Sequence, residues 1–321
     1  MKLFPLHLIP NNTNVDFMRL RWLSISVAVA LALVAVWAIA FKGFNYALDF
    51  TGGTLVELRF DRPADVDDVR GHLAAAGYEG AQVQTYGSGS DLLVRLQSSE
   101  SEASATASNK AAAAVLAAVD TDANHAHITR SEFVGPQVGK DLAMNAIWAL
   151  LFVVVGFLVY IAFRFEWKFA IAAILTTLHD VLIVAGFFAL TGREFDLTVL
   201  AGLLSVMGFS INDTIVVFDR VRENFRNLRV DPVEVLNRSV NQTLSRTIIT
   251  SFVAFLTVLA LYIYGGGSLE GMAISQMMGI VIGTISSIFI ACPLLTFGAL
   301  KVTKQDLMPK AKDLEALARR P

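Results

Sequence analysis

The sequence predicts a polytopic α-helical membrane protein with six transmembrane helices and one external α+β domain. Of its 321 residues, 55% are hydrophobic and only 17% are charged, and the mean hydropathy of +0.56 is too high for a water-soluble protein. Six apolar stretches are long enough to cross a hydrocarbon core about 30 Å thick. A polar segment of about a hundred residues separates the first stretch from the second, which indicates a folded domain outside the bilayer.

The six transmembrane segments are expected where apolar runs of about 20 residues occur. They cover residues 22–41, 142–163, 169–190, 197–218, 247–264 and 272–300. A secretory signal peptide is the alternative for the first run, because Arg19 and Arg21 precede it and Ala38-Ile39-Ala40 resembles a cleavage site. The run is longer than the roughly 7 to 15 apolar residues of a signal peptide, so a permanent anchor is favoured.

The distribution of lysine and arginine predicts the orientation in the membrane, because cytoplasmic loops carry the excess of these residues. The loop 219–246 holds six arginines, and the tail 301–321 holds six lysines and arginines. We therefore expect residues 1–21, this loop and the tail to be cytoplasmic. The domain 42–141 then lies on the opposite side.

The external domain 42–141 is expected to follow the order β-α-β-β-α-β, which is typical of a ferredoxin-like fold. Strands are predicted at 53–60, 82–86, 91–97 and 125–134, helices at 64–76 and 101–119, and a hairpin turn at 87–90. His125 and His127 share one face of the last strand and are candidate metal ligands. With no cysteine or third ligand nearby, a solvent-exposed pair is the better interpretation.

Several classes of function lack their minimal residues. The sequence holds no GxxxxGK[ST], GxSxG or HExxH motif, so no enzymatic activity, metal or organic cofactor is expected. The net charge of −2 and the absence of a basic aromatic cluster argue against a nucleic-acid partner. The single cysteine, Cys292, lies in an apolar run and is interpreted as a small buried hydrophobic residue.

A charged residue within the fourth span and an arginine at the start of the fifth point to chemistry inside the bilayer, because a charge costs about 2.5–3.5 kcal/mol at mid-membrane. Asp213 and Asn212 lie on a polar stripe of the fourth span, and Arg246 immediately precedes the fifth. Burial favours a neutral carboxyl group and a nearby arginine favours its ionised form, so Asp213 and Arg246 together form a minimal proton-coupled switch. A permanent ion pair is the alternative, and Arg246 alone is also typical of a residue that only fixes topology.

Two further features lie in the third and sixth spans. His179 and Asp180 fall near the middle of the third span, where Asp180 either joins a proton path with Asp213 or forms a static hydrogen-bonded contact between helices. Small residues recur every four positions in the sixth span, which predicts close approach of another helix. They are Ser275, Gly279, Gly283 and Ser287.

Four sequence blocks, in order, resemble the SecD/SecF family of bacterial protein-export membrane proteins, and in particular its SecF branch. Leu48-Asp49-Phe50-Thr51-Gly52-Gly53-Thr54 follows the first span, and the second block, Gly208 to Arg220, includes Asn212 and Asp213. The third is Asn241 to Thr247, and the fourth is Ser286 to Ala291. The resemblance covers nearly the whole chain, and its GG block marks Asp49, Gly52 and Gly53 as structural positions.

This resemblance implies half of an RND-superfamily transporter, which agrees with the absence of an internal repeat. It implies a heterodimer with SecD, assistance to the SecYEG channel, YajC as an additional partner, and a translocating preprotein as substrate. Protons would be the coupling ion, with Asp213 and Arg246 at family positions implicated in proton conduction. The location implied is the bacterial inner membrane, with the external domain in the periplasm. The alternatives are an RND-type half transporter of lipids or hydrophobic small molecules and a static scaffold.

Overall fold

The computed structural model describes residues 13–86, 90–96, 105–122, 124–303 and 306. It divides into two compact units, one made of Tyr46–Ala149 and one made of the residues before and after it. The unit Tyr46–Ala149 combines helices with a sheet, and the other unit is mainly helical.

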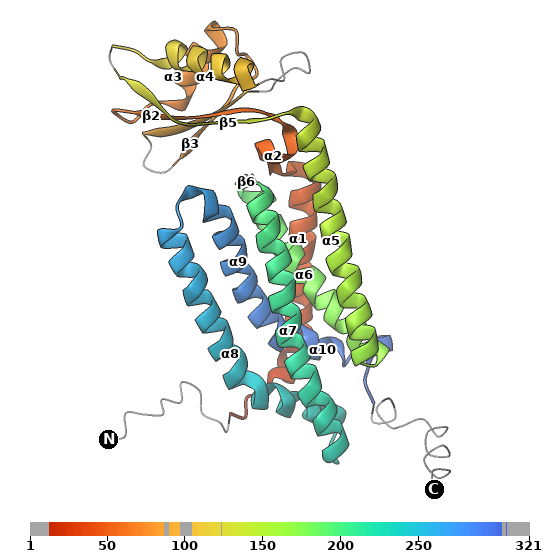
Figure 1. Cartoon of the computed structure of the whole chain (residues 1–321). Coiled ribbons are helices and arrows are strands. Elements are labelled where there is room, and N and C mark those ends of the chain that lie inside the picture. The colour runs from red at the N-terminus through yellow and green to blue at the C-terminus, as the bar shows by residue number, and fades with distance from the viewer. Residues whose placement is uncertain (1–12, 87–89, 97–104, 123, 304–305, 307–321) are drawn as a thin grey trace, which may run out of the picture. The chain divides into compact units, whose positions relative to one another are not determined.

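Six helices of the structure are long and apolar enough to cross a membrane, which confirms the predicted fold class. Figure 1 shows that they are arranged as neighbouring rods. The first runs through η1 (Phe17–Leu20), α1 (Arg21–Trp37) and η2 (Ala38–Lys42), followed by α5 (Pro136–Arg164), α6 (Trp167–Thr191), α7 (Leu197–Asn227) and α8 (Pro232–Tyr264). The sixth comprises α9 (Gly267–Ser286), η4 (Ser287–Ala291) and α10 (Cys292–Leu294).

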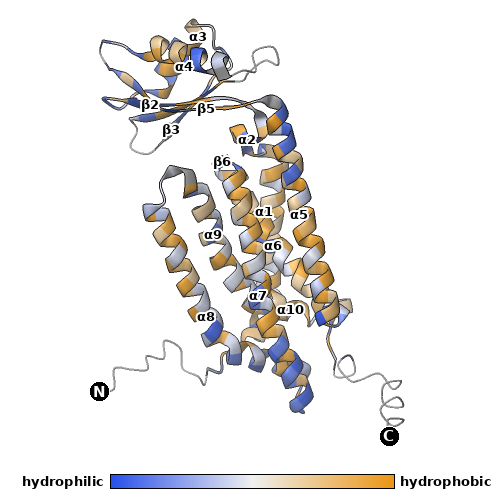
Figure 2. Ribbon diagram, viewed as in Figure 1, coloured by the Kyte–Doolittle hydropathy of each residue, from blue (hydrophilic) through white to orange (hydrophobic). Residues whose placement is uncertain are grey.

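The connector expected over 219–246 is corrected by the structure, since helices fill most of it. The polar last turns of α7 (Figure 2) continue to Asn227, and α8 begins at Pro232 with Asp231 as its N-cap. Asn224 of α7 donates hydrogen bonds of 2.9 Å to Ser239 and to Gln242 of α8. The two helices therefore stay paired beyond their apolar segments, because polar and apolar contacts both continue there.

The sixth span is also shorter than expected, since it ends at Leu294 rather than at residue 300. After α10 the chain turns back, and the N–H of Val302 donates to the carbonyl of Leu295 at 3.0 Å. A short 3-10 helix, η5 (Gly298–Leu300), lies within this turn, which we call the C-terminal elbow (residues 295–302). Hydropathy alone did not reveal it, because the elbow is itself largely apolar.

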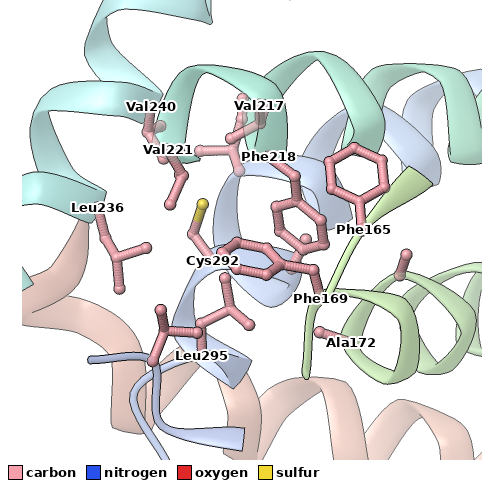
Figure 3. Packing of buried hydrophobic residues seen from close by; sticks show 14 of the residues in the cluster. Phe165, Phe169, Ala172, Val217, Phe218, Val221, Leu236, Val240, Cys292 and Leu295 are labelled. Carbon is pink, nitrogen blue, oxygen red and sulfur yellow. The ribbon is translucent and has the colours of Figure 1, made fainter. Parts of the chain in front are cut away.

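The main core of the helical unit lies between α6, α7, α8 and the region around α10. Figure 3 shows the aromatic rings of Phe165, Phe169 and Phe218 grouped beside Cys292. The rings of Phe169 and Phe218 meet edge to face with centroids 5.2 Å apart, and Cys292 is fully buried. This packing fixes the end of α7 that follows Asp213, since aromatic pairs add directional contacts to apolar burial.

The external unit holds a four-stranded antiparallel sheet and two helices, in the predicted order along the chain. Its elements are β2 (Gly53–Phe60), α3 (Val66–Ala75), β3 (Gln82–Tyr86), β4 (Asp91–Leu96), α4 (Ala105–Val119) and β5 (Ala126–Val134). The sheet order is β3-β4-β2-β5. Alternate residues such as Val56, Leu58, Leu92 and Val94 are buried against α3 and α4, as expected of a sheet with one covered face. Most of the expected hairpin turn lies outside the described residues.

The two glycines of the GG block stand where α2 (Leu48–Thr51) passes into β2. Gly52 and Gly53 have φ angles of 69° and 126°. Residues other than glycine rarely adopt such positive values. A Cβ atom on Gly53 would lie 2.4 Å from the backbone oxygen of Leu96. Both positions therefore require glycine for the geometry of the chain, and Asp49 lies in the single helical turn just before them.

His125, just before β5, and His127, within β5, each lie beside an aspartate. His125 Nδ1 lies 3.1 Å from Asp120 Oδ1, and His127 Nε2 lies 4.0 Å from Asp61 Oδ1. Both histidine side chains are largely exposed, at 55% and 72%. Within the described part of the chain, no three metal-binding side chains gather into one site.

Asp120 is expected to make the external unit sensitive to acid. The backbone N–H of Ala126 donates to Asp120 at 3.0 Å and, together with His125, holds the pKa of this carboxyl below its ordinary value. A lowered folded-state pKa stabilises the fold above the unfolded pKa of about 3.9, and this contribution is lost as pH falls through the lower folded value. We expect the melting temperature of Asp120→Asn to fall less steeply below about pH 4 than that of the wild type, measured by thermal unfolding between roughly pH 2.5 and 5. Identical slopes would contradict this assignment.

Candidate proton-coupling site within the membrane

Asp213 lies on the buried face of α7 and has only 3% of its surface exposed. Its carboxylate accepts a hydrogen bond from Ser251 Oγ of α8 at 3.4 Å. Ser251 Oγ in turn accepts one from Thr284 Oγ1 of α9 at 2.7 Å. Three helices thus converge on one titratable group through two hydroxyl groups, in a region where water is scarce.

Arg246 does not form an ion pair with Asp213 in this structure. It lies on α8 five residues before Ser251, close enough for its charge to act on the Asp213 carboxyl. Its own side chain is exposed and lines a polar cavity of about 330 Å³ at the end of the bundle where α7 ends and α8 begins. The cavity is also lined by Val216, Asp219, Arg220, Glu223, Gln242 and Thr243. The structure therefore shows the arrangement in which Asp213 is bonded to a hydroxyl and Arg246 faces the polar cavity.

Asp180 forms a second buried centre, on α6. It is completely buried and accepts hydrogen bonds of 2.6 Å from Ser210 Oγ of α7 and of 2.6 Å from Ser286 Oγ of α9. Its other carboxylate oxygen lies 3.1 Å from His179 Nδ1. Each short hydrogen bond to a carboxylate joins α6 to a different helix, so this residue ties three spans together.

His179 connects this centre to the first span. Its Nε2 atom lies 3.3 Å from the backbone oxygen of Ala28 in α1, so the two ring nitrogens contact different partners. The ring also lines an apolar cavity of about 330 Å³ with side chains of α1, α6, α9 and η4. His179 and Asp180 therefore act as one hydrogen-bonded unit despite pointing toward different helices.

Asn212 is the candidate that the structure does not bring to the site. Although it adjoins Asp213 in sequence, its side chain is exposed on the surface of α7, as is that of Ser205 two turns earlier. Consecutive residues of a helix point about 100° apart, so Asn212 leaves the interior when Asp213 enters it. The predicted polar stripe is thus divided between a buried side and an exposed side.

The small residues of the sixth span lie against α7. A Cβ atom on Gly279 would stand 2.0 Å from a methyl carbon of Val206, and one on Gly283 would stand 3.4 Å from Ser210. Ser275 and Ser287, at the two ends of the same row, are completely buried. We call this row the α7–α9 seam. Its close backbone approach allows Ser286 and Thr284 to reach the two aspartate centres.

Sequence reasoning located the two aspartates but not the hydroxyl groups around them. Ser210, Ser251, Thr284 and Ser286 are single small polar residues in apolar helices, and such residues are common in membrane spans. The spacing of Ser210 and Asp213, three apart on one helix, was the available signal that both face the interior. The partner helix of each hydroxyl group depends on packing that one sequence does not contain.

Comparison with known proteins identifies relatives over most of the chain. Residues 112–301 match the family model described as protein export membrane protein SecD/SecF, C-terminal, and residues 37–64 match the SecD/SecF GG motif. The protein translocase subunit SecF of Pseudomonas aeruginosa is 46% identical over 302 residues, covering 94% of this chain and 96% of the relative. The SecF subunit of Escherichia coli O157:H7 is 42% identical, covering 87% and 86%.

Solved structures give the same result for the fold. The crystal structure of SecDF from Thermus thermophilus, described as a translocon-associated membrane protein, matches with a TM-score of 0.81 and 38% identity over 91% of this chain. A structure of SecDF in a super-membrane-facing form matches with a TM-score of 0.66 and 35% identity over 98% of it. This chain spans only 39% and 41% of those two longer chains. By sequence and by fold, the chain belongs to the SecD/SecF family of protein-export membrane proteins.

Proposed function

We propose that this chain is an auxiliary subunit of the Sec protein translocase that, with SecD, uses the proton motive force to promote preprotein export across the bacterial inner membrane. The SecF names of its relatives support the translocase role. The observation that carries the proton coupling is the environment of Asp213. This carboxyl group is buried among apolar helices, holds one hydroxyl partner, and lies near a cation that faces a polar cavity.

Proton coupling follows from the two states of this carboxyl group. An ionised Asp213 attracts the guanidinium of Arg246, whereas a neutral Asp213 is satisfied by hydroxyl groups alone. Uptake of a proton from the periplasmic side and its release through the polar cavity would move α8 relative to α7 once per cycle. Since Ser251 and Arg246 lie on the same helix, coupling the exchange of one partner for the other to a displacement of α8 would convert a proton gradient into motion.

Asp180 has a different role in this proposal. Its three partners satisfy its carboxylate with short hydrogen bonds to Ser210, Ser286 and His179, which is the arrangement of a fixed contact between helices. We propose that it holds α6, α7 and α9 together while α8 moves. No step of catalysis and no metal or organic cofactor is required, because the only species exchanged is the proton.

A partner within the membrane fits the exposed polar face of α7. Ser205 and Asn212 face outward in this chain at the depth of the apolar layer, and such residues are usually covered by another helix. We assign this face to SecD. SecYEG, YajC and the emerging preprotein are further proposed partners, with the external unit in the periplasm and both termini in the cytoplasm.

Gradient-dependent export by reconstituted vesicles tests this function. Inverted vesicles that contain SecYEG and SecD, with or without this chain, are supplied with a secretory preprotein, and the protease-protected fraction is measured with and without a proton gradient. We expect the gradient to stimulate export only when the chain is present, and an uncoupler to remove the stimulation. Equal stimulation without the chain would refute the proposal. Gradient-dependent accumulation of a hydrophobic dye in these vesicles without stimulated export would favour the half-transporter alternative.

A further inference from the structure

A small cavity lies at the end of the helical unit that we propose to be cytoplasmic. The first residues of α1, the first turns of α8 and the segment after α10 meet at this end (Figure 1). The cavity has a volume of about 140 Å³. It is lined by Arg21, Trp22, Pro232, Val233, Leu236, Leu295, Thr296, Phe297, Lys301 and Val302. It is separate from the polar cavity at Arg246 and shares no residue with it.

The lining is amphipathic. Leu236, Leu295 and Val302 are buried and supply an apolar floor, while Arg21 and Lys301 contribute two positive charges. The ring of Trp22 meets that of Phe297 edge to face at 4.5 Å, and 67% of Trp22 is exposed beside the apolar surface of α1. A tryptophan at the end of a span, next to cations, is typical of the lipid headgroup layer.

Neither cation has an ion-pair partner among the residues that the structure describes. The nearby acids are engaged elsewhere, since Asp231 caps α8 through the N–H of Val233 at 2.8 Å. Asp306 accepts from Lys168 Nζ at 2.8 Å and from the N–H of Thr303 at 2.7 Å. Two uncompensated positive charges over an apolar floor favour an anion with an apolar portion.

The backbone of the cavity is held in place before any ligand binds. The C-terminal elbow is closed by the hydrogen bond from Val302 N–H to the carbonyl of Leu295. The backbone oxygen of Lys301 accepts a hydrogen bond of 2.8 Å from Lys168 Nζ of α6. A fixed backbone with a free ammonium group reduces the entropy lost on binding, which favours a preorganised site.

We propose that this cavity binds the phosphate headgroup of an anionic phospholipid of the surrounding leaflet. The Arg21 guanidinium presents two parallel N–H donors to phosphate oxygens, and Lys301 adds a second charge from the elbow. Trp22 and the apolar floor contact the glycerol region and the first methylene groups of the chains. A free phosphate ion shares the charge chemistry but leaves the apolar floor without a contact. This inference depends on the proposed orientation and not on proton coupling at Asp213.

Lipid binding by the purified full chain tests the proposal. Native mass spectrometry in a non-ionic detergent measures the affinity for dioleoyl phosphatidylglycerol, for dioleoyl phosphatidylcholine, and for phosphatidylglycerol in the presence of inorganic phosphate. We expect phosphatidylglycerol to bind more tightly than phosphatidylcholine and to resist displacement by phosphate. The double variant Arg21→Gln, Lys301→Gln should bind phosphatidylglycerol about thirtyfold more weakly, the effect of two basic side chains at an anionic membrane surface.

A matched control removes the same charge elsewhere. Arg19 and Arg229 are exposed, lie outside the cavity lining, and their double replacement by glutamine should leave the affinity within about threefold. The exchange Arg21→Lys, Lys301→Arg keeps both charges but moves the two-donor guanidinium to position 301. It should bind more tightly than the glutamine double variant, which separates loss of charge from loss of folding. Equal weakening in the Arg19/Arg229 control, equal affinity for phosphatidylcholine, or displacement by inorganic phosphate would each overturn the proposal. None of these outcomes would bear on gradient-dependent export.

Discussion

Replacement of Asp213 by asparagine is expected to reduce gradient-dependent export to the level of vesicles that lack the chain. Asparagine keeps the shape of the side chain and accepts the hydrogen bond from Ser251, but it cannot ionise. The side chain at position 213 can then no longer change its partner from the Ser251 hydroxyl to the Arg246 guanidinium. The proton gradient therefore has no titratable group at this site through which to act. The measurement is the protease-protected preprotein fraction with and without a proton gradient, with export in the absence of a gradient unchanged.

The same chemical change outside the membrane provides the control. Asp231 is the N-cap of α8, where asparagine caps equally well, so Asp231→Asn should retain full stimulation. Asp213→Glu keeps a titratable group and should retain part of it. Full gradient-dependent stimulation by Asp213→Asn would show that this carboxyl group is not the coupling site and that Asp213 is a fixed structural residue.

Substitution of Gly279 by alanine is expected to destabilise the helical unit strongly, although it adds only one methyl group. The new Cβ atom would lie 2.0, 2.6 and 2.8 Å from three side-chain atoms of Val206. Val206 is 1% exposed and cannot turn away into solvent. The helices α7 and α9 must then separate, at a cost of roughly 1–3 kcal/mol typical of overpacking. Thermal unfolding of the full chain in detergent should show a melting temperature lower by at least about 3 °C.

Two variants test the steric explanation. Gly156 of α5 has no atom within 4 Å of its Cβ position, so Gly156→Ala should leave the melting temperature unchanged or raise it slightly. The double variant Gly279→Ala, Val206→Ala removes the two closest atoms, which are the methyl carbons of Val206, but keeps its Cβ at 2.8 Å. It should recover part of the lost stability. A double variant with a melting temperature no higher than that of Gly279→Ala alone would show that the contact with Val206 is not the cause of the lost stability.

Hydrophobic run length was sufficient to place the spans, because the bilayer imposes the same length requirement on every one of them. It failed where helices leave the membrane, since the last turns of α7 and the first turns of α8 are polar and were therefore predicted to be a loop. Signals for the true ends were nevertheless present: Pro232 follows the capping residue Asp231, and Val221 and Phe225 recur at helical spacing before Asn227. Local capping residues were the better guide there than hydropathy.

The candidate site was predictable in part, for a related reason. The cost of burying charge makes Asp180 and Asp213 conspicuous in sequence, but it does not reveal what satisfies them. Ser286 and Thr284 lie two residues apart on α9 and bond to different centres, toward Asp180 and toward Ser251. Only the packing of α9 between α6 and α8 decides this division. Likewise, the exposure of Asn212 follows from the rotation of α7 in the bundle, which its sequence alone leaves open.

The unbroken length of α7 determines the surface along which α8 would be displaced in the proposed mechanism. This helix has 31 residues, which corresponds to about 46 Å, and Asp213 lies near its midpoint. In the proposed mechanism, α6 and α9 hold α7 in place through Asp180, so α7 is the fixed helix against which α8 is displaced. The start of α8 is tied to α7 through Asn224, so a displacement of α8 would be largest beyond this contact. The mechanism therefore needs one long stationary helix, α7, and one that moves, α8.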